Sequence, residues 1–493
     1  MKTAPSALSL AELAARVGGR VVGDAATVVT GVTHDSRRVR PGDLFAAVSG
    51  FERDGHAFVG DAARAGAAAV LVEREEAWPV PAVVVSDVRA ALGVIAHAVY
   101  GDPTRDLLVT GVTGTNGKTT TSFLIAAVLE ARHGEVAILG TLGLRRGGRA
   151  AATGFTTPEA TDLARVFADL AAGAVRAVSM EVSSHALELG RVRGVRFAAG
   201  AFTNLSPEHL DFHGTLEAYG EAKLAFFRTL AEQDAFAAVN ADDPWGERFR
   251  AAGPARTWRY SLEDDSAEVF AERYQPAPDG TRLVIRTPAG RFETRLALPG
   301  RYNAANALAA ASVGAGLGIA PALVGEALST VERVPGRFEV YQRGGVTAIV
   351  DYAHTPLAFE RVLKSVRQSG AKRVFCIFGC GGERDRAKRP EMARIAGTLA
   401  DVVYVTVDNP RREPIEQIMG ETLAGFAGTR ARWERIDDRS AAIHRAVAEA
   451  EPGDVVVLLG KGDEEYQLIG TEKHHFSDRE EANAALSSRE EDA

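Results

Sequence analysis

The stretch TGTNGKTTT carries the clearest chemical signal in this chain. Gly114 and Gly117 let the backbone curl so that amide N–H groups face phosphate oxygens, Lys118 adds positive charge, and Thr119 offers a hydroxyl to Mg²⁺. The spacing departs from a strict P-loop motif, because the position six before Lys118 is Val112. An apolar strand precedes the loop and a helix that begins near Lys118 follows it, which is the setting that a phosphate loop requires. The stretch therefore predicts a site for nucleotide phosphates.

Two later stretches hold candidate metal ligands. Glu181 follows the apolar run RAVSM, where a carboxylate at a strand end could hold Mg²⁺ beside the phosphates. His209 and His213 occur in NLSPEHLDFHG; one of them near a nucleotide could bind Mg²⁺, whereas zinc would need a further protein ligand. Lys223 stands alone in a helical segment, and such a lysine is usually a solvated charge. Taken singly, each of these side chains is as easily structural as functional.

The elements around these residues alternate between strands and helices. Between residues 27 and 106, runs such as AAAVLVE and PAVVVSD predict a small α/β unit in which the polar stretch THDSRRVRPGDLF is a loop. From 134 to 330, EVAILG, RAVSMEVS and DAFAAVN predict a mostly parallel sheet that is covered on both faces. Within it, the stretch from AEVFAERYQ to TRLALPG has Asp-Gly and Ala-Gly turns and predicts an antiparallel insertion.

A Pro-Gly pair in ERVPGRFEVYQ marks a boundary, after which the strand–helix rhythm restarts. The runs VTAIVDYAH, RVFCIFGCGG, DVVYVTVDNP and DVVVLLGKGD each end in a polar or Gly-rich turn, where ligands bind in open α/β sheets. We therefore predict an α/β fold of three domains. They are a small N-terminal α/β domain (1–106), a central domain with a P-loop-type, mostly parallel sheet (107–335) and a C-terminal Rossmann-like domain (336–493). The charged tail from Ser487 onward is expected to fray.

The composition excludes several classes of protein. A chain of 493 residues with 46% hydrophobic and 25% charged residues is typical of a globular protein with more than one core. The net charge of −8 argues against a general affinity for nucleic acid or anionic membrane. The N-terminus predicts a short amphipathic helix and no signal peptide, so we expect a cytoplasmic protein. Cys376 and Cys380 fit a reducing compartment, and they lack nearby partners for a zinc site.

An ordered set of motifs over nearly the whole chain resembles the Mur ligases. The set comprises TGTNGKTTT, EVSSHALELGR, NLSPEHLDFHG with EAYGEAKLAFF, RYNAANALAA, PGRFE, DYAHTP, FGCGGERDRAKRPEM and DNPRREP. Within that family it is most similar to the branch that adds the third residue of the peptidoglycan stem peptide. The resemblance implies ADP-forming, ATP- and Mg²⁺-dependent ligation of meso-2,6-diaminopimelate to the D-glutamate of UDP-N-acetylmuramoyl-L-alanyl-D-glutamate through an acyl phosphate. We also expect a monomer with no nucleic-acid or membrane partner.

The resemblance assigns roles at the nucleotide site that residue chemistry alone does not give. The residues implied to bind ATP are Gly114, Thr115, Asn116, Gly117, Lys118, Thr119, Thr120, Asn306, Arg337 and Asp351. The implied metal ligands are Thr119, Glu181, His209 and Lys223, the lysine as a carbamate. Lys118, Lys223 and His209 are the implied catalytic residues. A carbamate is an anion, so it could hold a cation that an ammonium would repel.

The resemblance also assigns the two other substrates, one to the N-terminal and central domains and one to the C-terminal domain. The residues implied to contact the uridine nucleotide are Ser36, Thr156, Thr157, Ser183 and Arg191. Those implied to contact diaminopimelate are Arg384, Asp408, Asn409, Pro410, Arg411, Gly460 and Glu464. The Arg411 guanidinium could pair with the distal carboxylate that lysine lacks, while Glu464 would receive the distal ammonium.

Two positions depart from the family pattern, and three other functions stay open. Asp463 replaces the usual His in the stretch GKGDE, and Phe155 stands where Asn is common. The alternatives are a sister ligase that adds L-lysine, a P-loop NTPase switch that hydrolyses nucleotide to drive partner binding, and a pure binding protein. Dependence of phosphate release on both acid and amine substrates would separate a ligase from a switch.

Overall fold

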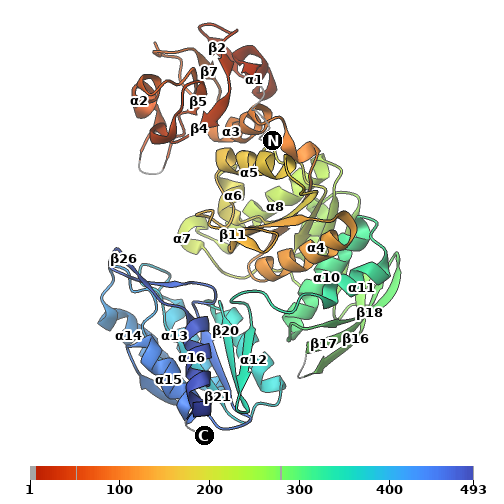
Figure 1. Ribbon diagram of the computed structural model, residues 1–493, viewed down its shortest axis with the longest axis vertical. Coiled ribbons are helices and arrows are strands. Elements are labelled where there is room, and N and C mark those ends of the chain that lie inside the picture. The colour runs from red at the N-terminus through yellow and green to blue at the C-terminus, as the bar shows by residue number, and fades with distance from the viewer. Residues whose placement is uncertain (1–6, 51–52, 278–279, 492–493) are drawn as a thin grey trace.

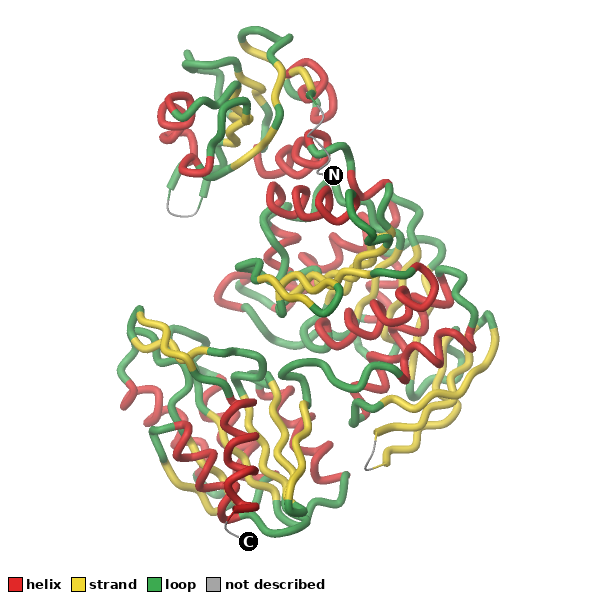
Figure 2. Tube along the Cα trace, in the orientation of Figure 1, coloured by secondary structure: helices red, strands yellow, loops and turns green. Residues whose placement is uncertain are grey.

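The computed structural model describes residues 7–50, 53–277 and 280–491. Three α/β units follow one another along the chain, from the N-terminal unit at the top of Figure 1 to the C-terminal unit at the bottom. In each unit helices flank a sheet, as the red and yellow segments of Figure 2 show. Within the described ranges, no helix has both the length and the apolar character that crossing a membrane requires.

The N-terminal sheet has five strands, which are parallel except at one edge. In spatial order they are β2 (Arg20–Val22), β7 (Ala82–Val84), β6 (Ala69–Val72), β5 (Asp43–Ala46) and β4 (Gly31–Thr33). Helices α1 (Leu10–Val17) and α3 (Val88–Val99) share a core with Leu44, whereas Phe45 belongs to a second core beside α2 (Val59–Arg64).

The predicted loop THDSRRVRPGDLF is wrong at both ends. Its first residue, Thr33, ends β4, and its last three form most of β5. Leu44 and Phe45 are buried on opposite faces of the sheet. Only two adjacent apolar residues mark this strand, so the sequence offers no alternation long enough to indicate it.

The central sheet has eleven strands, of which the inner ones, from β9 to β16, are parallel. In spatial order they are β11 (Arg149–Ala151), β10 (Gly143–Arg146), β9 (Val136–Gly140), β12 (Ala177–Glu181), β8 (Leu108–Thr113), β13 (Ala199–Phe202), β14 (Phe236–Asn240), β15 (Thr257–Ser261), β16 (Val269–Ala277), β17 (Gly280–Thr287) and β18 (Gly290–Leu296). The predicted antiparallel segment is β16–β18, which extends the edge of this same sheet. Residues 278 and 279 of its predicted Asp-Gly turn lie outside the described ranges.

Both faces of the central sheet are buried, as the apolar runs predict. In β14, Phe236 and Ala238 belong to one core and Ala237 and Val239 to another. The first core includes α4 (Lys118–His133), α10 (Arg301–Gly316) and α11 (Pro321–Ser329). The second includes α5 (Ala160–Ala171), α8 (Leu216–Glu232) and α9 (Gly246–Ala252). Alternate residues of one strand thus pack against different helix layers.

The C-terminal sheet places the last strand of its parallel set between two earlier ones. In spatial order the strands are β19 (Glu339–Arg343), β20 (Val346–Asp351), β24 (Val455–Leu459), β21 (Val374–Phe378), β22 (Val402–Val405) and β23 (Arg432–Arg435), with only β19 antiparallel. Helices α12 (Pro356–Gln368), α13 (Lys388–Leu399) and α14 (Ile415–Leu423) cover one face, and α15 (Arg439–Glu449) and α16 (Asp478–Glu491) the other. The hairpin of β25 (Tyr466–Ile469) and β26 (Glu472–His475) follows β24.

The expectation that the tail frays from Ser487 onward is wrong for residues 487–491, and residues 492 and 493 lie outside the described ranges. Helix α16 continues to Glu491. Leu486 is buried in a core with Ala446 of α15, and the Arg489 guanidinium donates to the backbone oxygens of Val447 and Ala450. These contacts hold the last helical turns although the segment is rich in charge.

Candidate active site

The phosphate loop connects β8 to α4, and its glycines allow close approaches. Gly117 has φ +87°, and a Cβ there would lie 2.5 Å from Oδ1 of Asn306 on α10. Gly114 has φ +143° and lies directly against the Thr203 hydroxyl. A side chain at either position would therefore meet both strain and a clash. Among the residues that the structure describes, no side chain caps the start of α4, so its first amides can receive an anion.

Two lysines converge on one carbonyl of this loop. Lys118 Nζ donates to the backbone oxygens of Gly114 at 3.0 Å and Thr115 at 2.8 Å. Lys223 Nζ reaches the same Gly114 oxygen at 2.9 Å and lies 4.4 Å from the centre of the Tyr219 ring. The Lys223 side chain is 1% exposed, and burial and the charge of Lys118 lower its pKa well below the usual value. The surroundings thus favour a neutral amine at Lys223.

Glu181 ends β12 beside the first turn of α4. Its Oε1 accepts hydrogen bonds from the Thr119 hydroxyl and the Thr141 amide, both at 2.9 Å. These two oxygen-bearing side chains suit Mg²⁺, which prefers carboxylate and hydroxyl ligands and keeps several waters. His209 precedes α7 (Leu210–His213) with a 45% exposed side chain, and its ring stands edge-on to His185 at 4.7 Å. Burial and nearby positive charges lower the pKa of His209, which favours the neutral form that binds metals.

The described parts of the chain contain no group of three His, Cys, Asp or Glu side chains arranged to hold a metal ion. A metal site here would therefore combine Glu181 with the Thr119 hydroxyl, with His209 and with groups from the substrates.

A cavity of about 590 Å³ lies over the loop, between the central and C-terminal units. Nine of the ten residues implied to bind ATP line it: Thr115, Asn116, Gly117, Lys118, Thr119, Thr120, Asn306, Arg337 and Asp351. Glu181 and His209 line it too. Gly114 and Lys223 are absent from this lining, and the buried Lys223 contacts the loop through the Gly114 carbonyl.

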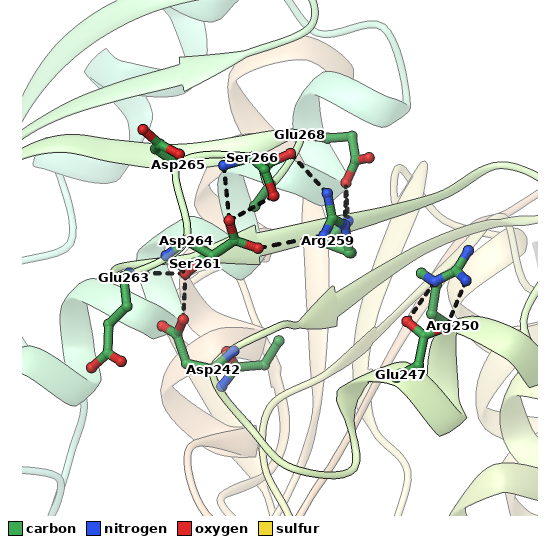
Figure 3. A network of polar contacts seen from close by, with 12 residues as sticks. Asp242, Glu247, Arg250, Arg259, Ser261, Glu263, Asp264, Asp265, Ser266 and Glu268 are labelled. Carbon is green, nitrogen blue, oxygen red and sulfur yellow. Dashed lines mark hydrogen bonds and ion pairs between the residues drawn. The ribbon is translucent and has the colours of Figure 1, made fainter.

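A further wall of the cavity comes from the ends of β14 and β15, and the prediction missed it. Asp242, Leu262 and Glu263 are among its lining residues. Figure 3 shows the Ser261 hydroxyl directed at Asp242, and the Asp242 carboxylate also accepts from the Leu262 amide at 2.8 Å. In the same network Asp264 and Glu268 flank the Arg259 guanidinium (Figure 3). The signal was present in the sequence, because Asp242 and Asp243 come just after the predicted strand DAFAAVN.

Glu208 is a second residue that the prediction passed over. Its Oε1 lies 3.2 Å from Nε2 of His354, which comes from the C-terminal unit. Nδ1 of His354 faces the Tyr352 carbonyl at 2.9 Å, so both ring nitrogens face oxygen atoms. Burial raises the pKa of Glu208, but the hydrogen bond and charge of His354 outweigh it and hold that pKa well below its usual range. This ion pair joins the two units across the cavity.

Four of the five residues implied to contact the uridine nucleotide form one connected group. The Thr157 hydroxyl donates to the Glu181 backbone at 2.8 Å, and Arg191 donates to the Thr157 carbonyl at 3.1 Å. Thr156 and Ser183 line the large cavity. Phe155, 55% exposed, stacks on the Arg191 guanidinium at 4.4 Å.

Ser36 lies apart from that group, in the N-terminal unit. Its neighbour His34 touches Thr161 of α5 at 3.0 Å, and Arg38 pairs with Asp162 at 2.9 Å. A small cavity of about 70 Å³ between His34 and Glu159 separates this loop from Arg191, which pairs with Glu159 at 2.6 Å.

The residues implied to contact diaminopimelate gather at the carboxyl ends of β24, β21 and β22, outside the large cavity. Asn409 Nδ2 donates to Glu464 Oε2 at 2.8 Å, and Gly460 packs beside Asp408. Arg411, at φ +54°, donates to the Gly382 carbonyl at 2.7 Å. The exposed Arg384 follows Gly382 on the same loop.

Asp463 couples this group to the nucleotide cavity. It pairs with Arg337 at 2.7 Å, and Arg337 stacks 4.3 Å from the centre of the Tyr352 ring. Arg337 and Tyr352 both line the nucleotide cavity. The family position where His is usual thus holds, in this chain, a carboxylate partner for an arginine of that cavity.

Family models match most of the chain in three consecutive parts. They are "Mur ligase family, catalytic domain" over residues 28–100, "Mur ligase middle domain" over 112–314 and "Mur ligase, glutamate ligase domain" over 336–462. The chain belongs to the Mur ligase family. A relative from Geobacillus thermodenitrificans, named UDP-N-acetylmuramoyl-L-alanyl-D-glutamate–2,6-diaminopimelate ligase, is 42% identical to this Mur ligase over 461 residues, 92% of this chain and 94% of its own.

Solved structures agree with this membership. A structure of a UDP-N-acetylmuramoyl-L-alanyl-D-glutamate–2,6-diaminopimelate ligase is 32% identical, with a TM-score of 0.73 over 98% of this chain and 99% of its own. A MurF ligase from Thermotoga maritima, solved in complex with ADP, shares the fold at 20% identity, with a TM-score of 0.65 over 93% of this chain and 98% of its own. The predicted fold class, α/β units with a mostly parallel central sheet, is confirmed.

Proposed function

We propose that this Mur ligase joins meso-2,6-diaminopimelate to the D-glutamate of UDP-N-acetylmuramoyl-L-alanyl-D-glutamate, with ATP converted to ADP and phosphate. The observation that carries the choice of amine is the group Asp408, Asn409, Arg411 and Glu464, which places one cationic and two anionic side chains around one strand edge. Diaminopimelate offers a distal carboxylate and a distal ammonium to match them. The relatives' names supply the same substrates.

The cavity over the phosphate loop is the proposed ATP site. The α4 amides, Lys118 and Arg337 would offset charge on the phosphates while the glutamate γ-carboxylate attacks the γ-phosphorus, forming an acyl phosphate and releasing ADP. The neutral amine of diaminopimelate then attacks the acyl carbon, loses a proton and expels phosphate. Bound Mg²⁺, held by Thr119, Glu181 and His209, would supply further charge neutralisation.

Lys223 is the proposed carbamate. A neutral amine adds CO₂ and loses one proton, giving an anion in place of a cation. The buried setting of Lys223 and its repulsion by Lys118 favour the neutral amine that this addition requires. The product would lie beside the loop carbonyl of Gly114, where it could support a second Mg²⁺.

The proposed organisation follows the substrates. Residues 1–106 and the group around Arg191 would bind the uridine nucleotide, 107–335 would bind ATP, and 336–493 would bind the amino acid. We propose that the protein is a monomer. A nucleotide-linked substrate and ATP place the proposed reaction in the cytoplasm.

The decisive experiment supplies purified enzyme with ATP, Mg²⁺, the muramyl dipeptide nucleotide and either meso-diaminopimelate or L-lysine. We expect tripeptide product by mass spectrometry and ADP release only with diaminopimelate. Comparable turnover with L-lysine would favour the sister ligase, and ADP release without either co-substrate would favour an NTPase switch.

A further inference from the structure

We propose that Lys461 is a positioning residue that sets the charge of the amine site, an inference that rests on the proposed function. Lys461 is fully buried, at 0% exposure, two residues after the end of β24. None of the assignments above includes it. It lies at the centre of three residues implied to contact diaminopimelate.

The ammonium of Lys461 is surrounded by three acceptors. Nζ lies 3.1 Å from Asp408 Oδ1, 3.2 Å from Asn409 Oδ1 and 3.3 Å from Glu464 Oε2. An ammonium has three hydrogens, so these contacts use its whole donor capacity. Lys461 therefore has no hydrogen left for a substrate, and it acts on the substrate only through these neighbours.

The arrangement leaves one oxygen of Glu464 for the incoming amine. Asn409 and Lys461 both donate to Oε2 of Glu464. Among the described residues, no hydrogen bond to Oε1 is found. With Lys461 in place, the two carboxylates and one ammonium sum to a single negative charge, which suits one incoming ammonium.

Lys461 also favours the ionised form of Glu464. Burial and the charge of Asp408 raise the pKa of Glu464, and Lys461 acts against both. Without Lys461 the carboxyl would hold its proton to higher pH and lose its attraction for an ammonium. The charged or titratable groups facing Glu464 are Asp408, Lys461, Tyr466, Tyr352 and Arg439.

The backbone around the site depends on the same group. Asn409 Oδ1, held by Lys461, also accepts from the Leu468 amide at 2.9 Å, and Gln467 donates to the Asp408 carbonyl at 2.9 Å. Lys461 thereby connects the Asp408–Asn409 turn to the β25–β26 hairpin. Its removal should therefore weaken amino-acid binding before it affects the other substrates.

The test compares Lys461→Met with the full-length wild-type enzyme. We expect the KM for diaminopimelate to rise at least about tenfold, because the charge-assisted hydrogen bond between Glu464 and the substrate ammonium is lost. The KM values for ATP and the muramyl nucleotide should change little. We also expect the diaminopimelate KM of the variant to fall as pH rises, more steeply than in the wild type. Lys473→Met is the matched control, because Lys473 is exposed on β26 and contacts the same Tyr466 ring as Lys461.

A second variant distinguishes a folding defect from a specific loss of diaminopimelate binding. Asp408→Asn combined with Lys461→Met removes one of the two carboxylates that the single change leaves unpaired, so it should fold if the single variant does not, and it should still bind diaminopimelate poorly. Folding is checked by thermal denaturation with and without ATP. An unchanged diaminopimelate KM in a folded variant, or an equal rise in all three KM values, overturns the positioning role. Absence of amide synthesis in the wild type would overturn the proposed function instead.

Discussion

The phosphate site and the amine site of this Mur ligase are built in opposite ways. The core of the phosphate site is one continuous segment, in which Gly114, Gly117 and the start of α4 present backbone groups, and Arg337 adds a cation from the C-terminal unit. The amine site assembles side chains from separate segments around Lys461, because β24 enters the sheet between β20 and β21. A site made of backbone is local in the sequence, whereas a site made of side chains depends on topology.

The largest expected effect comes from a change in the phosphate site. Lys118→Ala removes a cation from the loop, and we expect amide synthesis to fall on the order of 10³-fold, since charge on the transferring phosphoryl group is no longer offset. Product formation by mass spectrometry measures it. Near-normal turnover in this variant would mean that the backbone alone carries the phosphate site.

The second-largest expected effect comes from a change in the amine site. Arg411→Ala should lower kcat/KM for diaminopimelate about 10²-fold through loss of a carboxylate partner, with the KM for ATP nearly unchanged. Arg412→Ala, the exposed neighbour, is the control. If both variants behave alike, the selection of diaminopimelate does not reside in Arg411.

Measurements at acidic pH test the stability of the fold separately from catalysis. His97 of α3 is buried without a hydrogen-bond partner for either ring nitrogen among the described residues, and burial lowers its pKa to about 4. The contribution of the neutral ring to the free energy of unfolding is fully present above the unfolded-state pKa of about 6.5. It is lost as the pH falls from there towards 4.

We therefore expect about 2 kcal/mol less unfolding free energy at pH 5 than at pH 7 from this group alone, measured by urea titration. His97→Leu should flatten the dependence, whereas the exposed His474→Gln should not. An unaltered slope in His97→Leu would assign the acid sensitivity to other groups.

The smallest effect concerns the group implied to contact the uridine nucleotide. Phe155→Asn restores the residue usual in the family and removes the ring from the Arg191 guanidinium. We expect the KM for the muramyl nucleotide to change about two- to fivefold, in line with one exposed cation–π contact. Steady-state kinetics at saturating ATP measures the KM for the muramyl nucleotide. A change in the KM for ATP instead would assign Phe155 to the ATP site.

The sequence predicted the elements with long apolar runs and missed what depends on distant contacts. The loop, α4 and β8 followed from local pattern, as did both faces of the central sheet. Lys223 gave no signal as a residue, because its burial under Gly114 comes from the packing of α8 on the loop. Glu208 was missed because its partner, His354, lies in another unit.

The position of β24 has a consequence for synthesis of the chain. The ribosome makes the phosphate loop early, but the strand that completes the amine site and fills the middle of its sheet emerges after residue 454. A growing chain would thus be able to hold nucleotide well before it can choose an amine, and loss of its last forty residues or so would split the C-terminal sheet between β20 and β21.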